Sequence, residues 1–341
     1  MRFIPLSVCL LAFCATRFLC ADGPEVDSID YAHPDIYRDF PDSLGDRAAI
    51  LAQASKLKGK SKLQTIRNVL HWMDKNLQYD GKIAYQWRNY DDVMREKKYG
   101  GCADQGIVCG VLLKGAGIPT VWVKTMDVAW IWTFKKERPF SSWSGHVFLE
   151  VFVDGKWSLL DPGGKTLYQN YSPKMKLLPG QRFAYHKGND PKAMVMSLQW
   201  EEWKKQTTAY FRQLDETLLP VDEKGGTSLV PMAYVIGNSP YYQALTAMAV
   251  KSGLRAATSF NCQYDKYLPE ANGHVILIET HEGKPIVPQK VLEKYYPKAF
   301  AGLSRPSKSI RIKNTRIVFV DPSEPSQKAI EKTLSEFAET P

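Results

Sequence analysis

A cysteine that follows two glycines is the first residue in this chain whose position suggests chemistry. Cys102 comes directly after Gly100 and Gly101, and the apolar residues behind it recur at helical spacing. A thiol at the start of a helix faces unpaired backbone N–H groups and the positive end of the helix dipole, and both favour the nucleophilic thiolate. The backbone N–H of Cys102 can also help to hold a developing oxyanion. This position predicts a nucleophile.

A histidine and an aspartate lie where a β-hairpin would bring them together. The sequence predicts strands over 145–153 and 156–161, joined by Asp154-Gly155, a pair that tolerates the positive φ angles of a two-residue turn. In that register His146 and Asp161 are diagonal neighbours on one face, within reach of a side-chain hydrogen bond. A turn with an odd number of residues would place them on opposite faces, so the turn and the pairing support each other.

The three side chains fit the roles of nucleophile, base and orienting residue. Asp161 bound to one imidazole nitrogen would fix the tautomer of His146, and the other nitrogen can face Cys102. A lone cysteine after two glycines is usually structural, and a lone histidine in a strand usually belongs to the core. Their joint placement with Asp161 favours a catalytic role for all three.

The other cysteines do not predict a disulfide scaffold. The helix would separate Cys102 and Cys109 by roughly 10 Å along its axis, whereas a disulfide needs Cα atoms within about 7 Å. Cys109 is therefore predicted to be a small core residue. Without residues 1–21 the only other cysteine is Cys262, which leaves an odd number.

Four motifs, taken in order, resemble the core of transglutaminase-like proteins. They are Gly101-Cys102-Ala103-Asp104, Gly117-Ile118-Pro119, Gly145-His146-Val147-Phe148-Leu149-Glu150-Val151 and Trp157-Ser158-Leu159-Leu160-Asp161-Pro162. The helix with His71-Trp72-Met73 also resembles the one that precedes the family's cysteine. The resemblance covers about residues 56–165, and the family's catalytic Cys, His and Asp match Cys102, His146 and Asp161. It implies a papain-like α+β core.

The resemblance implies chemistry on an acyl group without a cofactor. We expect hydrolysis of a peptide or other amide bond through a Cys102 acyl-enzyme, with a protein or peptide as substrate. The alternatives are cross-linking, in which an amine accepts the same acyl group, and a non-catalytic binding module with a relic site. No acidic loop has calcium-ligand spacing, and His186, His274 and His281 are scattered, so no metal site is expected.

Two further sets of residues are candidates for substrate contact. The family's second oxyanion donor lies upstream of the cysteine, where Gln86 and Trp87, with Tyr85, are open alternatives. A long aromatic loop is predicted to carry three tryptophans, Trp130, Trp132 and Trp143. They either line a substrate cleft or form a flap packed on the core.

The periodicity of the chain predicts the elements that position these residues. Helices are predicted over 63–79, from Cys102 to about Gly115, and over 199–218, and a strand over 120–123. Beyond them, strands at 233–236, 275–278 and 317–320 alternate with helices that begin at Ser239, lie near Val291 and run from Ser326 to Phe337. This alternation predicts a second, small α/β domain with a largely parallel sheet.

The length of 341 residues suggests two domains with appendages. The predicted divisions are a signal peptide at 1–21, an N-terminal arm at 22–55 that is extended over 22–50, a catalytic domain at 56–190, a helix and linker at 191–228, and an α/β domain of unknown role at 229–341.

The N-terminus favours export. Arg2, an apolar run from Phe3 to Ala15 and a small residue at Ala21 are typical of a cleaved signal peptide, which predicts a secreted or periplasmic protein. The run is short for a membrane span, although an uncleaved anchor is the alternative. Lipid attachment at Cys14 or Cys20 is disfavoured because each follows a large apolar residue.

The overall charge gives little support for nucleic acid as a partner. The formal net charge is +9, but no basic run with interleaved aromatic residues stands out. A moderate positive charge fits weak attraction to anionic surfaces. The sequence leaves the oligomeric state open.

Overall fold

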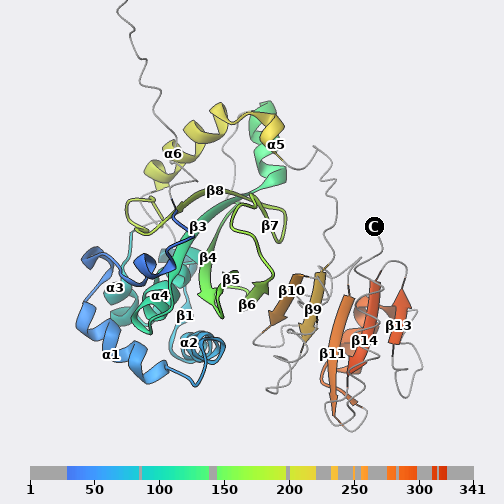
Figure 1. Ribbon diagram of the computed structural model, residues 1–341. Coiled ribbons are helices and arrows are strands. Elements are labelled where there is room, and N and C mark those ends of the chain that lie inside the picture. The colour runs from blue at the N-terminus through green and yellow to red at the C-terminus, as the bar shows by residue number, and fades with distance from the viewer. Residues whose placement is uncertain are drawn as a thin grey trace, which may run out of the picture.

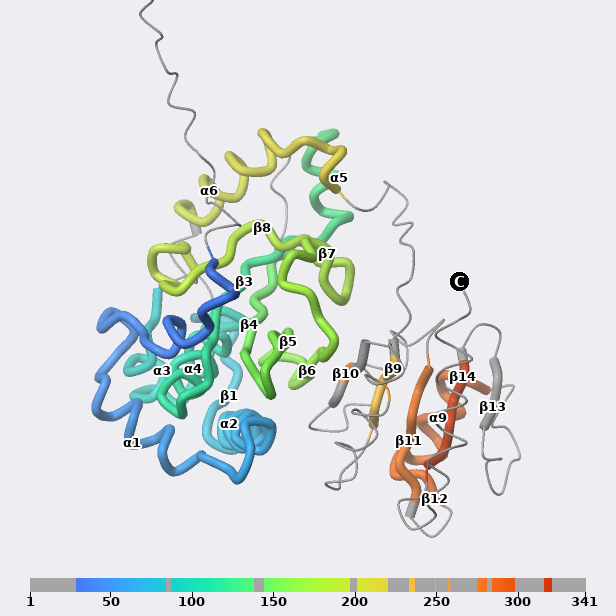
Figure 2. Tube along the Cα trace, in the orientation of Figure 1, coloured from blue at the N-terminus to red at the C-terminus, as the bar shows by residue number. Residues whose placement is uncertain are grey.

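A mixed sheet of twelve strands runs through the described part of the computed structural model. Its order is β13-β14-β11-β9-β10-β6-β5-β4-β3-β8-β7, and β12 pairs with β11. The structure describes residues 29–83, 87–137, 144–196, 200–219, 232–236, 249, 255–259, 275–281, 284–297, 309–312 and 315–320. The sequence-predicted signal peptide at 1–21 lies outside these residues. Figures 1 and 2 show helices α1 to α4 gathered on one side of β3–β5, and α5 and α6 near β8.

The bounds of the elements are as follows. The helices are α1 (Arg47–Leu57), α2 (Lys62–Asn76), α3 (Tyr90–Glu96), α4 (Cys102–Gly115), α5 (Val128–Glu137), α6 (Trp200–Gln213) and α9 (Gln289–Tyr295), with short 3₁₀ helices at Pro34–Arg38, Asp42–Leu44, Gly81–Ile83 and Glu216–Leu218. The strands are β3 (Thr120–Asp127), β4 (Gly145–Val153), β5 (Lys156–Asp161), β6 (Thr166–Gln169), β7 (Leu177–Leu178), β8 (Arg182–Gly188), β9 (Met232–Ile236), β10 (Arg255–Ser259), β11 (Val275–His281), β12 (Lys284–Pro285), β13 (Ser309–Ile312) and β14 (Thr315–Val320). A separate pair, β1 (Gln78–Tyr79) and β2 (Lys98–Tyr99), forms a two-stranded parallel sheet.

The predicted hairpin is confirmed residue by residue. Strands β4 and β5 have the predicted bounds, and Val153 pairs with Lys156. Asp154 and Gly155 have φ angles of 50° and 78°, as a two-residue turn with two left-handed positions requires. The α+β class predicted from the resemblance is likewise confirmed.

Helix α4 packs against the sheet through two glycines. A Cβ atom at Gly110 would lie 2.5 Å from Cζ2 of Trp122, and one at Gly106 would lie 2.7 Å from Cγ1 of Val147. The indole Nε1 of Trp122 donates to the carbonyl of Gly106 at 2.9 Å. The missing side chains therefore let the helix that begins at Cys102 lie close to strands β3 and β4.

Replacing Gly110 with alanine should destabilise the fold by about 1–2 kcal/mol. The new methyl group would overpack the contact with Trp122, and the gain in helix propensity offsets only part of that cost. Urea unfolding measures the change. The control is Gly101→Ala, because Gly101 has an extended backbone and no described atom within 4 Å of its added Cβ; its effect should stay within about 1 kcal/mol. A Gly110→Ala protein as stable as the wild type would contradict this packing.

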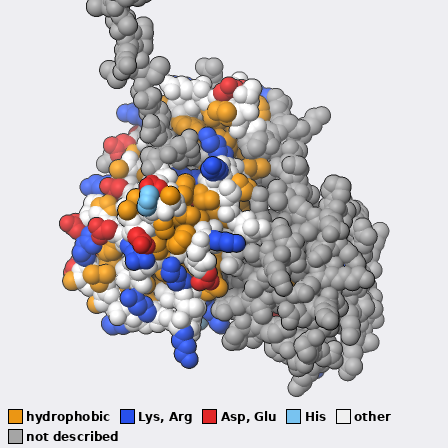
Figure 3. Space-filling model, viewed as in Figure 1, with side chains coloured by type: hydrophobic (Ala, Val, Ile, Leu, Met, Phe, Trp, Pro, Cys, Tyr) orange, Lys and Arg blue, Asp and Glu red, His pale blue; other side chains and the backbone are white. Residues whose placement is uncertain are grey.

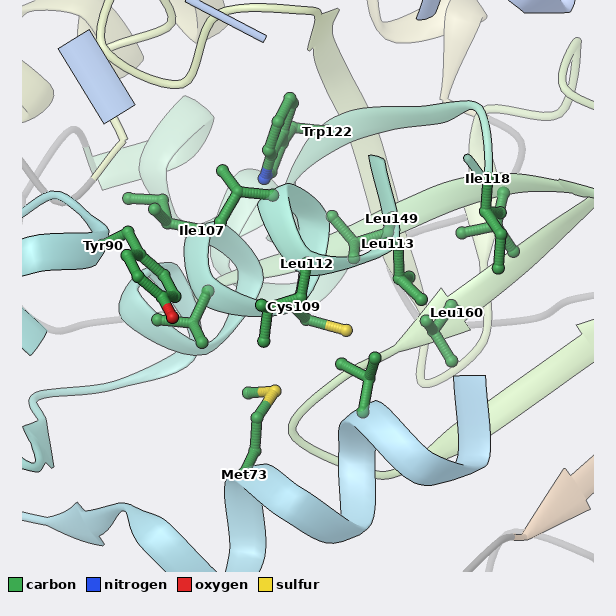
Figure 4. Close-up of a cluster of buried hydrophobic side chains, with 14 of the residues drawn as sticks. Met73, Tyr90, Ile107, Cys109, Leu112, Leu113, Ile118, Trp122, Leu149 and Leu160 are labelled. Carbon is green, nitrogen blue, oxygen red and sulfur yellow. The ribbon is translucent and has the colours of Figure 1, made fainter. Parts of the chain in front are cut away.

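The main core lies between α4, α2 and the strands. Figure 4 shows Cys109 of α4 among apolar side chains, with Met73 of α2 on one side and Leu149 and Leu160 of the sheet nearby. Cys109 is completely buried and free, and its burial raises the pKa of its thiol. The prediction that Cys109 is a core residue is confirmed. The helix predicted over 63–79 is α2 (Lys62–Asn76), and it buries Ile66, Val69, Leu70 and Met73.

Part of the predicted N-terminal arm is a helix. Residues Arg47–Leu57 form α1, which buries Ile50, Ala54 and Leu57. The side chain of Asp46 accepts hydrogen bonds from the backbone N–H groups of Ala48 and Ala49, the usual device that starts a helix. The expectation of an extended chain over 22–50 is wrong for Arg47–Ile50, because the apolar positions of this segment follow a helical repeat.

The C-terminal strands follow the prediction in outline. β9, β11 and β14 cover the three predicted strands, and the pairs β9–β11 and β11–β14 are parallel. The sequence reading missed β10, which pairs in parallel with β9 and antiparallel with β6. The helix predicted near Val291 is α9. The helices predicted over 239–251 and 326–337 fall outside the described residues, apart from Ala249.

In the described part of the chain, no helix has the length and apolarity needed to span a membrane.

Candidate active site

The first candidate residue stands at the beginning of a helix. Cys102 is the first residue of α4, and Gly101 before it supplies no side-chain cap. The thiol is free and partly buried, and the residue packs against the main core. At this position the backbone N–H groups of the first helical turn have no partner inside the helix. The arrangement provides a nucleophilic atom beside unpaired backbone donors.

The hairpin brings the second and third candidates together. Nε2 of His146, near the start of β4, lies 3.0 Å from Oδ1 of Asp161 at the end of β5. The same carboxylate oxygen accepts a hydrogen bond of 2.8 Å from the N–H of Gly164. The ring of Phe148 meets the imidazole edge-to-face, with centroids 4.8 Å apart. The contact predicted from the hairpin register is therefore present, and Asp161 leaves Nδ1 of His146 available for Cys102.

The surroundings of His146 favour its protonated form. Burial alone would lower the pKa of His146, but the charge and hydrogen bond of Asp161 and a hydrogen bond to Cys102 outweigh it and raise the pKa to about 10. These contacts therefore favour the imidazolium over the neutral imidazole. An imidazolium beside a thiol at a helix start is the setting in which a thiolate is stabilised by charge.

A glycine turn closes over the imidazole and points to a residue that the sequence reading missed. A Cβ atom at Gly163 would lie 3.7 Å from Cε1 of His146, 3.5 Å from Oδ1 of Asp161 and 3.1 Å from Oε1 of Gln105. Gln105 therefore lies beside the candidate triad. It follows Cys102 by three positions in α4, so the helical spacing already put both on one face.

An ion pair fixes this turn to the helical side of the molecule. Lys165, just after the two glycines, binds Asp74 of α2 through its ammonium group. The Lys165 side chain is 12% exposed and that of Asp74 is 33% exposed. The contact ties the loop that follows Asp161 to α2, so both layers of the core contribute to the position of the candidate site.

The structure gives the other predicted site residues different surroundings. Trp87 is partly buried against the main core that includes α4, whereas Gln86 and Tyr85 lie outside the described residues. Trp130 is buried and stacks on Phe134 at 5.1 Å.

The predicted aromatic loop is wrong in part. Residues Val128–Glu137 form helix α5, because the apolar side chains of this segment follow a helical repeat. Trp130 belongs to a cluster with β8 and α6, and Trp132 packs against the same cluster. Trp143 lies outside the described residues.

Charged side chains of both signs are dispersed over one face of the described residues. Figure 3 shows Lys and Arg side chains interspersed with Asp and Glu on the face it presents. No group of three or more His, Cys, Asp and Glu side chains within the described ranges is arranged to hold a metal ion.

Comparisons with known proteins find a family model that matches part of this chain. The model of the transglutaminase-like superfamily matches residues 50–162. No curated protein matches the chain. Two solved structures are similar in part. A provisionally assigned cysteine protease from Cytophaga hutchinsonii has 18% identity over 51% of this chain and 53% of its own, with a TM-score of 0.35.

The second structure is described as a TGase. It has 15% identity over 40% of this chain and 34% of its own, with a TM-score of 0.22. The chain thus spans about half of the first structure and a third of the second. The family model covers the nucleophile candidate, the hairpin and its closing aspartate. Residues 50–162 are therefore the part of the chain that matches the transglutaminase-like superfamily.

Proposed function

We propose that the protein hydrolyses a peptide or other amide bond, with Cys102 as nucleophile, His146 as acid and base, and Asp161 as the residue that orients His146. The observation that carries the proposal is the imidazole of His146, held by Asp161 at 3.0 Å on one nitrogen and near enough to Cys102 for Cys102 to raise its pKa. The intact set of three residues supports an enzyme over a relic binding module.

The proposed reaction passes through an acyl-enzyme. The Cys102 thiolate attacks the carbonyl carbon, and the backbone N–H of Cys102 holds the resulting oxyanion. The intermediate collapses as the imidazolium of His146 gives its proton to the leaving amine. The neutral imidazole then takes a proton from water, and the hydroxide attacks the thioester carbon. Collapse of the second tetrahedral intermediate breaks the bond to Cys102 and releases the acid product and the Cys102 thiolate, while His146 keeps the proton taken from water, so the starting pair is restored.

Open space beside the nucleophile supports water as the acceptor. A Cβ atom added to Gly101 would have no described atom within 4 Å, apart from Gly101 itself and its two chain neighbours. Cys102 itself is partly exposed. Transfer to an amine would require exclusion of water from the acyl-enzyme. Cross-linking through the same acyl-enzyme is the second candidate, because the family model and the triad candidates fit it equally.

A peptide assay in ¹⁸O-labelled water separates the candidates. The protein is incubated with a mixed peptide library, with and without an excess of a fluorescent primary amine, and products are read by mass spectrometry. Hydrolysis predicts ¹⁸O in the new carboxylates with Cys102-dependent yield. Amine adducts in place of labelled acids would favour cross-linking. No product and no adduct at Cys102 would contradict both and favour the binding module.

We also propose that the protein is exported and that it acts on a protein or peptide outside the cytoplasm. The features of residues 1–21 support export, and the chemistry supports a protein or peptide as substrate. The region from 229 to 341 is proposed to recruit the substrate or to target the enzyme. Expression with a C-terminal reporter tests export: a processed N-terminus after residue 21 supports it, and an unprocessed chain in the cytoplasm contradicts it.

A further inference from the structure

A buried ion pair lies beneath the start of α4, outside the three candidate triad residues. Nη1 of Arg88 is 2.7 Å from Oδ2 of Asp104, and the side chains are 2% and 1% exposed. Burial of two charges is costly unless each is paired and hydrogen-bonded. Asp104 is only two residues from the candidate nucleophile. The buried pair is therefore close enough to Cys102 to help position it.

The carboxylate of Asp104 holds the chain in front of Cys102. Its Oδ2 atom accepts a 2.8 Å hydrogen bond from the backbone N–H of Gly100. Asp104 is the third residue of the helix, and a carboxylate at that position can bond back to the chain that enters the helix. Gly101 has no side chain to cap the helix. Asp104 therefore fixes the backbone just before Cys102, because it belongs to α4 and also binds the N–H of Gly100.

Arg88 also binds strand β2 and helix α3, which precede Cys102 in the chain. Its Nη1 atom also donates to the carbonyl of Lys98 in β2 at 2.9 Å, and Nη2 donates to Glu96 at 2.8 Å and to the carbonyl of Asp92 at 3.3 Å. Strand β2 ends immediately before Gly100. One guanidinium thus fixes the segment before the nucleophile, and its planar fork suits such multiple contacts.

The pair also sets the charge next to the thiol. An unbalanced carboxylate two residues from Cys102 would oppose formation of a thiolate. Arg88 balances that charge. Glu96, the other acidic partner of Arg88, has a side chain that is 38% exposed, so solvent screens its charge more strongly.

We propose that Asp104 is the positioning residue for Cys102 and that Arg88 neutralises it, so that the backbone of Gly100 to Cys102 faces the acyl group without a negative charge opposing the thiolate. The inference rests on the proposed function, since it assigns Cys102 as the nucleophile.

Two substitutions should shift the reactivity of Cys102 in opposite directions. Arg88→Gln leaves the Asp104 charge unbalanced, and the pH midpoint of Cys102 alkylation by iodoacetamide should rise by about one unit. Asp104→Asn keeps an oxygen for the Gly100 N–H but removes the charge, so the midpoint should fall. Glu96→Gln is the matched control, because it removes another Arg88 partner without touching Gly100, and its midpoint should stay within about 0.3 units.

A third substitution tests the geometry. Asp104→Ala should lower kcat by about 100-fold with little change in KM, and Asp104→Asn should recover at least about tenfold of that loss. Circular dichroism confirms that each variant is folded at the assay temperature. If Arg88→Gln does not fold, Arg88→Lys takes its place: it keeps the charge but loses the fork, so kcat should fall while the midpoint stays.

The outcomes separate this inference from the proposed function. Alkylation needs no substrate, so a wild-type Cys102 that reacts as an ordinary thiol overturns the proposed function. An activated wild-type thiol with unmoved midpoints in both Arg88→Gln and Asp104→Asn overturns only the positioning role. Equal kcat values for Asp104→Ala and the wild type would do the same.

Discussion

Replacing Cys102 with alanine should reduce kcat/KM for amide hydrolysis by at least about 10⁴-fold, because it removes the thiol that is proposed to form the acyl-enzyme. Alanine is a strong helix former, and Cys102 is the first residue of α4, so the fold should be retained. Steady-state hydrolysis of an active peptide from the library gives the rate, and a thermal melt gives the fold. The effect should appear in the acylation step, with no covalent intermediate in the intact mass.

Cys109→Ala is the matched control for that variant. Cys109 lies in the same helix, is completely buried, and has a thiol pKa raised by burial. Its loss should leave a small cavity and reduce stability by about 1 kcal/mol while kcat/KM changes little. An active Cys102→Ala protein, or an equal loss of activity in Cys109→Ala, would remove Cys102 from the mechanism.

Replacing Asp161 with asparagine should lower kcat by about 10³–10⁴-fold. The carboxylate accepts the hydrogen bond from Nε2 of His146, and an amide can present its N–H₂ group instead and favour the wrong tautomer. Asp161 is 4% exposed and packed, so the isosteric change should preserve the fold. Single-turnover kinetics measures the loss. Wild-type kinetics in Asp161→Asn would contradict the orienting role.

The same substitution should change the dependence on pH. In the wild type the pKa of His146 is raised to about 10, against burial, mainly by Asp161. Protonation of the leaving amine needs the imidazolium, so activity should fall only as pH rises towards 10. Asp161→Asn should move that alkaline limb down towards neutral pH. An alkaline limb at the same pH in both proteins would show that Asp161 does not hold the proton on His146.

The stability of the fold should also depend on pH through His146. The folded pKa of about 10 exceeds the unfolded value of 6.5. The stabilisation of the folded state by protonated His146 is therefore complete below pH 6.5 and is lost as pH rises through 10. The difference in melting temperature between wild type and Asp161→Asn should shrink over that window.

The hairpin could be predicted from sequence because its determinants are local. Asp154-Gly155 fixes the turn, and the turn fixes the register of every pair in β4 and β5. The start of α4 was predictable for the same reason, since Gly100-Gly101 precedes an apolar run with helical spacing. Together these two local signals located Cys102, His146 and Asp161, whose catalytic roles stay predictions.

Contacts across long stretches of chain were not predictable. Arg88 and Asp104 are 16 positions apart, and the pairing of β10 with β6 joins residues such as Thr258 and Leu167. The periodicity of the sequence does not predict such contacts, because they depend on how the helices and the sheet pack together.

The mistaken aromatic loop has a different cause. Trp130, Trp132 and Phe134 alternate in sequence, which hides the helical repeat of Val128, Ile131 and Phe134. The side chain of Asp127 accepts a hydrogen bond from the N–H of Trp130, a helix-start contact that the sequence reading overlooked. The buried side of α5 then follows from packing against β8 and α6.

The most direct test of the central claim is alkylation of Cys102 by iodoacetamide between pH 5 and 9, mapped by mass spectrometry in the wild type and in His146→Ala. The account predicts selective labelling of Cys102 well below pH 8 in the wild type and a clear loss of that reactivity in His146→Ala, because the imidazolium stabilises the thiolate. Labelling that follows an ordinary thiol in both proteins, or no labelling of Cys102, would contradict the proposed catalysis and favour a binding module.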